Sequence, residues 1–356
     1  MIDMYKTAAR VVALGLLIAL VACSGPGDTS QSISSDEAVR TMDALVTDVE
    51  SALTGLEDDP DLVAVAGFFE GTTTVTPAGV LSPAQLAEPF ELPRGVLAWS
   101  PETGYAPDEG ATPPAPYDYQ VIGNPSAVNA ELRIDWGDAG SAPANLAFAG
   151  STIELPTDAS AVAMVGGDTV VEATLTASWE LVEETRCGAT ASSLTATSLV
   201  FDVTAGPRAF TFTFATTPDA TSLSLDLAFG GIAADLGFTI DEQLRILAEP
   251  CQTGLPLGGA IGTPSSAGLD IGVTSPDHSA AVSAAIAEIV WDTQVDPVAL
   301  AAFDLSGSLT IDGSEAGTLE GSFDESASPQ FDGSVSFDDE TMTFDELAEE
   351  LAGTEP

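Results

Sequence analysis

The sequence is poor in positive charge. Lysine and arginine together number 8 and histidine 1, against 55 aspartates and glutamates, so the formal net charge is −47. A surface this acidic repels phosphate backbones and anionic head groups, which argues against nucleic acid as a partner and against electrostatic docking on membranes. The same acidity predicts that added salt, and a pH lowered toward the carboxyl range, stabilise the fold, because both weaken repulsion between carboxylates.

Groups that commonly act in catalysis are scarce as well. Lys6 is the only lysine and His278 the only histidine, so a histidine-dependent triad has a single possible base. The chain has no P-loop, no dinucleotide fingerprint and no paired zinc histidines. We therefore expect no cofactor and no enzymatic activity, with His278 in a loop. A carboxylate-dependent glycosidase stays open as an alternative, because so many acidic residues allow a close pair.

Only three cysteines are present, and the first follows an apolar run. Lys6 and Arg10 precede this run, which extends from Val11 to Ala22 and ends next to Cys23. A basic start, a short apolar stretch and a small residue before the cleavage point are typical of a secretory signal. The run is shorter than the ~20 residues that a membrane span needs.

The residues Leu20, Val21, Ala22 and Cys23 resemble the lipobox of bacterial lipoproteins. The resemblance implies that residues 1–22 are removed and that Cys23 carries acyl chains such as palmitate. Several acyl chains give stable membrane attachment. The protein would then lie in the cell envelope, held to a membrane by lipid and facing the periplasm or the exterior. The alternative is a core helix from Val11 to Ala22 with an ordinary buried thiol at Cys23.

Two cysteines remain after this processing, Cys187 and Cys251. Because an exported protein meets an oxidising environment, we expect them to form a disulfide. Reduced, separately buried thiols are the alternative.

Apolar residues make up 45% of the chain, enough for a folded core despite the charge. Residues 23–33 read as a flexible tether. Residues 34–71 predict a helical hairpin, with a capping box at Ser34 and Glu37, a first helix that ends at Gly55, and a second that starts at Asp59 and Pro60 and stops at Gly71.

The remaining chain predicts strands joined by tight turns. Residues 72–166 form a β-rich region, with candidate strands at 95–99, 117–122, 128–136 and 146–154. Residues 167–356 alternate apolar and polar side chains, as in Phe210, Phe212 and Phe214, and predict an antiparallel meander covered on one face. Ser279 to Trp291 fits helix or strand. A capping box at Thr343 and Glu346 starts a short C-terminal helix. The predicted fold class is therefore mainly β, in one or two antiparallel sheets built from hairpins.

Aromatic residues gather around a proline-rich loop at residues 101–125. Tyrosine and tryptophan offer rigid surfaces on which proteins and carbohydrates dock, so this loop is a possible binding site. The alternative is that these side chains pin a long loop to the sheet. The residues concerned are Trp99, Tyr105, Tyr117 and Tyr119.

Clusters of acidic residues suggest weak calcium binding as a further possibility. None has the spacing of an EF-hand loop, so no metal ligand is assigned, and a solvated acidic face is the alternative. The clusters are Asp108 with Glu109, Asp135 with Asp138, and Asp338, Asp339 with Glu340.

These observations favour a lipid-anchored protein of the cell envelope that acts by binding or structural presence. One alternative is a carrier whose curved sheet holds a lipid or another apolar ligand. A carrier of this kind requires an apolar sheet face that the rest of the chain leaves uncovered.

Overall fold

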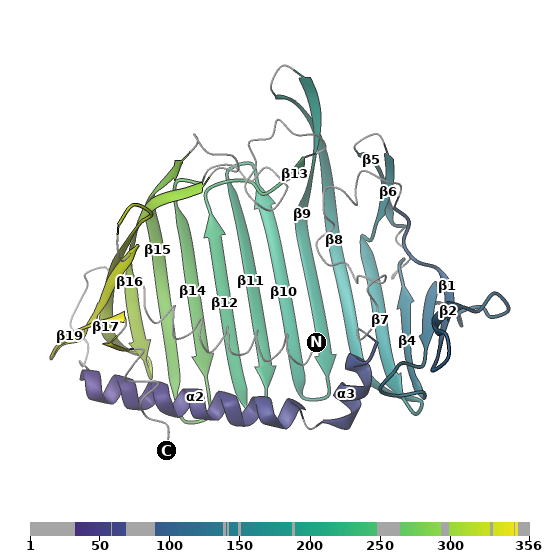
Figure 1. Cartoon of the computed structure of the whole chain (residues 1–356), viewed down its shortest axis with the longest axis horizontal. Coiled ribbons are helices and arrows are strands. Elements are labelled where there is room, and N and C mark those ends of the chain that lie inside the picture. The colour runs from purple at the N-terminus through teal and green to yellow at the C-terminus, as the bar shows by residue number, and fades with distance from the viewer. Residues whose placement is uncertain are drawn as a thin grey trace. The chain divides into compact units, whose positions relative to one another are not determined.

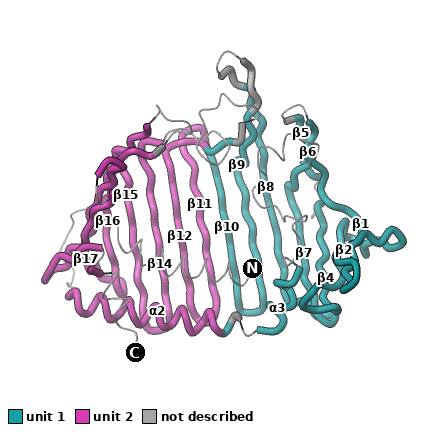
Figure 2. Tube along the Cα trace, in the orientation of Figure 1, with its two compact units in different colours: residues 1–2, 55–216, 244–260 teal, residues 3–54, 217–243, 261–356 magenta. Residues whose placement is uncertain are grey.

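The computed structural model describes residues 33–57, 59–68, 90–137, 140, 142–148, 151–186, 189–247, 264–292, 299–327, 330–344 and 346–347. The protein is mainly β, and its strands pair mostly antiparallel. The chain divides into two compact units, shown in Figure 2. Unit 1 contains residues 55–216 and 244–260, and unit 2 contains residues 3–54, 217–243 and 261–356. Each unit is described by itself.

Unit 1 is built on a sheet with the strand order β2, β1, β3, β4, β7, β8, β9, β10. All neighbours are antiparallel except β1 and β3, which run parallel. The short strand β13 also pairs with β9. The strands are β1 (Gly95–Ser100), β2 (Gly104–Pro107), β3 (Tyr119–Ile122), β4 (Ala130–Asp135), β7 (Asp158–Val165), β8 (Asp168–Arg186), β9 (Ala189–Ala205), β10 (Arg208–Thr217) and β13 (Ile246–Leu247).

Two smaller elements complete unit 1. Strands β5 (Ala144–Phe148) and β6 (Ser151–Leu155) form a separate two-stranded ribbon. Helix α3 (Pro60–Ala66) begins at the N-cap Asp59, whose carboxylate accepts hydrogen bonds from the amides of Asp61 and Leu62. It packs against β7 and β8.

Unit 2 is an antiparallel meander with the strand order β11, β12, β14, β15, β16, β17, β18, β19. The turns at Gly230–Gly231 and Asp312–Gly313 lie at the same end of these strands, as the registers require (Figure 1). The strands are β11 (Ala220–Phe229), β12 (Ile232–Ile240), β14 (Ala267–Thr274), β15 (Ser279–Asp292), β16 (Ala299–Ile311), β17 (Ser314–Asp324), β18 (Phe331–Ser336) and β19 (Thr341–Thr343).

Helix α2 (Ser35–Glu57) crosses this end of the unit 2 strands (Figure 1). Its first amide, that of Ser35, donates to Oδ1 of Asp339 at 2.9 Å. Near its other end, a Cβ atom at Gly230 would lie 2.8 Å from Cβ of Ala52, so only glycine fits this turn beneath the helix. Twenty residues of α-helix are about 30 Å long. This length equals about six of the distances that separate neighbouring strands in a sheet.

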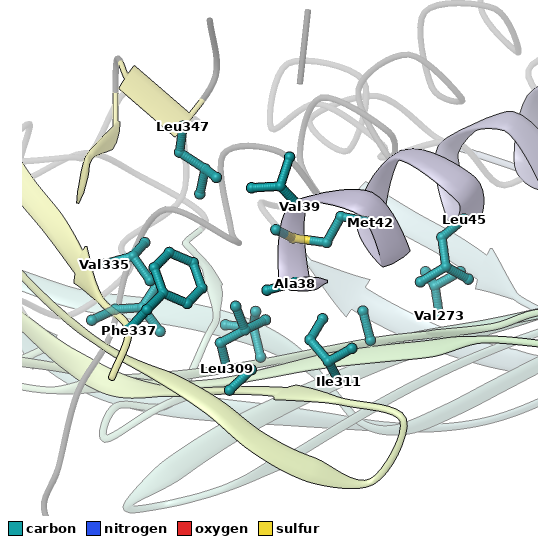
Figure 3. Close-up of a cluster of buried hydrophobic side chains, with 14 of the residues drawn as sticks. Ala38, Val39, Met42, Leu45, Val273, Leu309, Ile311, Val335, Phe337 and Leu347 are labelled. Carbon is teal, nitrogen blue, oxygen red and sulfur yellow. The ribbon is translucent and has the colours of Figure 1, made fainter. Parts of the chain in front are cut away.

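The core of unit 2 lies between α2 and the sheet. Figure 3 shows Leu309 and Ile311 of β16 beneath Ala38 and Met42 of α2. All four are at most 2% exposed. The side of α2 that carries Ala38, Met42 and Leu45 is therefore buried against a sheet face, and the spacing of these residues is that of one face of a helix.

Several sequence predictions are confirmed and several are wrong. The predicted tight turns between strands form, for example at Gly206, Gly230 and Asp312. The capping box at Thr343 also forms, because its hydroxyl and amide both donate to Glu346 at 2.8 Å. The C-terminal helix beyond residue 347 lies outside the described residues. The two N-terminal helices belong largely to different units, so their packing as a hairpin stays a prediction.

The predictions that were wrong concern segments in which apolar residues follow neither the helical nor the strand period clearly. Residues 146–154 were expected as one strand and form part of the β5–β6 ribbon. Ser279 to Trp291 is a strand, because its backbone pairs with β14 on one side and β16 on the other. Strands β2, β7, β13 and β19 had no clear sequence signal. Helix α2 passes through Gly55 to Glu57, and α3 ends at the C-cap Gly67, before Gly71.

Among the described residues, none of the helices has both the length and the hydrophobicity required to cross a bilayer.

Candidate apolar binding face

The candidate site is one face of β8, β9 and β10 in unit 1. Residues directly opposite each other in an antiparallel pair project to the same side of the sheet. Phe201 is opposite Leu175 of β8 and Phe212 of β10, and Leu199 is opposite Phe214. The rings of Phe201 and Phe210 are 6.1 Å apart and meet edge to face. We call Leu175, Leu199, Phe201, Phe210, Phe212 and Phe214 the phenylalanine face.

The opposite side of the same strands is polar. Glu172, Thr174 and Thr176 alternate with the apolar residues of β8. On β10, the hydroxyl of Thr211 donates to Asp202 of β9 at 2.6 Å. The two sides of this sheet therefore differ in chemistry, as the alternation in the sequence predicts.

Helix α3 covers one end of the apolar side. Val171 and Ala173 of β8 pair with Ala163 and Ala161 of β7. Those alanines pair in turn with Leu132 and Ile134 of β4, which pack around the buried ring of Phe68 just after α3. The strand registers therefore place the residues that pack near α3 and the phenylalanine face on the same side of one sheet.

The β5–β6 ribbon covers the other end. Trp179 of β8 projects to the same side of the sheet as Leu175. Its indole Nε1 donates to the carbonyl of Pro156 at 2.8 Å. Trp179 packs with Leu194 of β9 against Ile153 and Leu155 of the ribbon. Both ends of the apolar side therefore have identified elements packed against them.

Between these two ends the side chains stay partly exposed. All six residues of the phenylalanine face have intermediate exposure, and none belongs to the buried clusters formed by the described residues. Large apolar side chains that are held on a rigid sheet without becoming core suggest a surface for an apolar ligand.

An ion pair lies at the edge of this face. Arg208, at the start of β10, projects to the same side of the sheet as the phenylalanines of that strand. Its Nη1 lies 2.8 Å from Oδ2 of Asp59. The hydrogen bond from Arg208 lowers the pKa of Asp59, so this carboxylate stays ionised at neutral pH. Asp59 is also the N-cap of α3, and the pair therefore ties that helix to the end of β10.

Unit 2 shows a similar arrangement on a smaller scale. Ile232 of β12 is buried under α2, and alternation places Leu236 and Phe238 farther along the same face. Phe238 is 36% exposed, with Leu223 and Leu269 as its cross-strand neighbours. Here too a helix covers one end of an apolar face.

The aromatic residues singled out in the sequence lie elsewhere in unit 1. Trp99 and Tyr105 are cross-strand partners on β1 and β2. Tyr119 is 3% exposed within the cluster around Phe68, and its burial raises its pKa to about 12. The Tyr105 hydroxyl donates to the carbonyl of Gly67 at 3.5 Å. A partner could therefore reach Tyr119 only by opening this core.

Tyr117, like Trp99 and Tyr105, is partly exposed, and the guanidinium of Arg133 lies 5.7 Å from its ring centre. Arg133 is in turn paired with Glu131. Of the four aromatic residues, Tyr119 is buried and the other three keep part of their surface exposed.

The other predicted site residues are placed as follows. Cys23, Cys187 and Cys251 lie outside the described residues, so lipidation and the disulfide stay predictions. Asp339 accepts from the amide of Ser35, and Asp108 and Asp135 accept from the amides of Gly110 and Gly137. Asp138 lies outside the described residues. Within the described part of the chain, no three acidic, histidine or cysteine side chains come together as metal ligands.

The described residues do gather aspartates on the polar face of unit 2. Asp226 and Asp235 are direct cross-strand partners, and Asp270 lies diagonally opposite Asp235. Burial, Asp226 and Asp270 together raise the pKa of Asp235. These carboxylates lie in unit 2, and the aromatic loop lies in unit 1.

We expect Asp235→Asn to stabilise unit 2 at pH 7, because like charges directly opposite each other cost roughly 0.2 to 1 kcal/mol. Because the pKa of Asp235 is higher in the folded protein than in the unfolded chain, its ionisation destabilises the fold. This destabilisation exists only while Asp235 is ionised. The gain should therefore vanish as the pH falls through the range just above the ordinary carboxyl pKa, and it should shrink in 1 M salt. Thermal unfolding at several pH values measures this.

Asp304→Asn is the matched control, since the residues directly opposite Asp304 are Ala287 and Ser322, and acidic residues lie only diagonally opposite it, at Glu320 and Asp324. Equal stabilisation by both substitutions would show that general charge reduction, and not the pair with Asp226, is responsible.

In comparisons with protein-family models, with curated proteins and with solved structures, we found no match to this chain.

Proposed function

We propose that this protein is a lipid-anchored binding protein of the cell envelope that carries an apolar ligand on the phenylalanine face. The observation that supports this function is the partial exposure of six large apolar side chains between two ends that α3 and the β5–β6 ribbon cover. An apolar ligand would remove this surface from water, at about 25 cal/mol per Å² buried.

The lipobox supplies the location in this proposal. Cys23 would be held in a membrane by acyl chains, and residues 24–33 would tether the folded part. The helical hairpin expected from residues 34–71 would then lie nearest the membrane. A carrier in this position would receive its ligand from a lipid-rich surface without needing a positively charged docking patch, which this sequence lacks.

The uncharged fluorescent probe N-phenyl-1-naphthylamine tests this function. We expect the purified chain from residue 24 onward to bind it with enhanced fluorescence. The substitution Phe212→Asn should weaken binding about tenfold, since one buried aromatic contact is worth roughly 1.5 kcal/mol or more.

Thr213→Asn is the matched control, because Thr213 is the next residue of the same strand and projects to the opposite side. It should leave binding unchanged. If the probe fails to bind, or if both variants lose affinity equally, the phenylalanine face is not the binding surface and the proposal is wrong.

A further inference from the structure

The charges around the phenylalanine face bear on which apolar molecules it can hold. From residue 171 to 181, the positions of β8 that project to this side carry only apolar side chains. The corresponding positions of β9 and β10 are also apolar except for Arg208 and the buried Thr216. Among the described residues at these positions, Arg208 is therefore the one cation available to a ligand.

That cation is already engaged. Arg208 and Asp59 each have a quarter of their side-chain surface exposed and are 2.8 Å apart, so the pair sits at the edge of the face as a neutral unit. An anionic head group placed there would meet Asp59 together with Arg208, within a chain of net charge −47. A carboxylate or phosphate that leaves water without gaining a partner is strongly disfavoured.

We propose that the phenylalanine face selects uncharged long-chain molecules and discriminates against those with an anionic head group. This inference rests on the proposed function and names the ligand class for the same site. Charge complementarity identifies the occupant: an apolar surface, a neutralised arginine and an acidic surrounding favour a ligand such as a long-chain alcohol or ester over a fatty acid.

Displacement of N-phenyl-1-naphthylamine by two ligands of equal chain length tests the selection. At pH 8 and low ionic strength, 1-dodecanol should displace the probe at a concentration at least about fivefold lower than dodecanoate, because the acidic field and the paired arginine oppose the carboxylate. Equal potency, or a preference for dodecanoate, would overturn the inference while leaving the proposed function intact. Failure of the probe and of both ligands to bind would instead overturn the proposed function.

The variant Asp59→Asn tests the role of the ion pair. Asparagine serves as well as aspartate at an N-cap, so α3 should stay folded while Arg208 loses its charged partner. We expect dodecanoate to gain about two- to fivefold in affinity, the range of an exposed ion pair, and 1-dodecanol to be unaffected.

Asp304→Asn is again the control, because it removes one negative charge in unit 2 without releasing an arginine. A gain for dodecanoate in both variants would assign the effect to net charge alone and overturn the role given to Arg208. No gain in Asp59→Asn, with circular dichroism showing an intact fold, would overturn it as well.

Discussion

Replacing Cys23 with alanine should release the protein from the membrane or leave its precursor uncleaved. In a lipoprotein, the acylated cysteine is the attachment point, and cleavage depends on it. Within the described residues, no helix could take over the anchoring. The acidic surface offers no electrostatic substitute, because a net charge of −47 is repelled by anionic lipids. The expected effect is therefore nearly complete loss of the membrane-bound mature form.

Membrane fractionation and mass spectrometry of the mature N-terminus measure this effect. Cys187→Ala is the control, since that cysteine is outside the lipobox and should leave anchoring unchanged. A mature N-terminus at an unmodified residue other than Cys23 would contradict the lipoprotein assignment.

Leu309→Ala should destabilise unit 2 by about 2 to 5 kcal/mol, the usual cost of a leucine-sized cavity in a core that cannot collapse around it. Leu309 is 0% exposed, and its strand neighbours are Val282 and Gly317. Position 317 is already tight, since a Cβ there would lie 3.1 Å from the carbonyl oxygen of Ser336. With α2 above and a close-packed sheet below, little can move into the space.

Urea unfolding of the variant measures the loss, read from the transition of unit 2 if the units unfold separately. Val290→Ala is the matched control on the neighbouring strand, because Val290 is 52% exposed and its truncation should change stability by less than about 0.5 kcal/mol. If Leu309→Ala costs no more than this control, α2 does not form the core of unit 2 as described.

The sequence predicted the strands where the apolar alternation is long and a turn residue ends it. Phe210, Phe212 and Phe214 lie on one strand and project to one side of it as expected, because a period of two fixes which side chains share a face. Ser279 to Trp291 stayed ambiguous because its alanines favour helix, and only pairing with strands on both sides decides for β.

The candidate site could be predicted only in part. Alternation on β8, β9 and β10 indicates an apolar face, yet nothing in the sequence says how far a helix will cover it. That depends on long-range contacts such as the pair between Asp59 and Arg208, which are 149 residues apart. Similarly, Tyr119 resembles a docking residue in the sequence, and only the packing of Phe68 shows that it is core.

Photolabelling tests the central claim most directly. The full mature chain is irradiated with an uncharged long-chain alcohol that carries a diazirine near its end, and the labelled residues are located by mass spectrometry. The account predicts labels on residues 199–201 of β9 and 210–214 of β10, which excess 1-dodecanol removes and which Phe212→Asn reduces. Labels confined to other segments, or unchanged by excess 1-dodecanol, would show that the phenylalanine face does not bind apolar ligands.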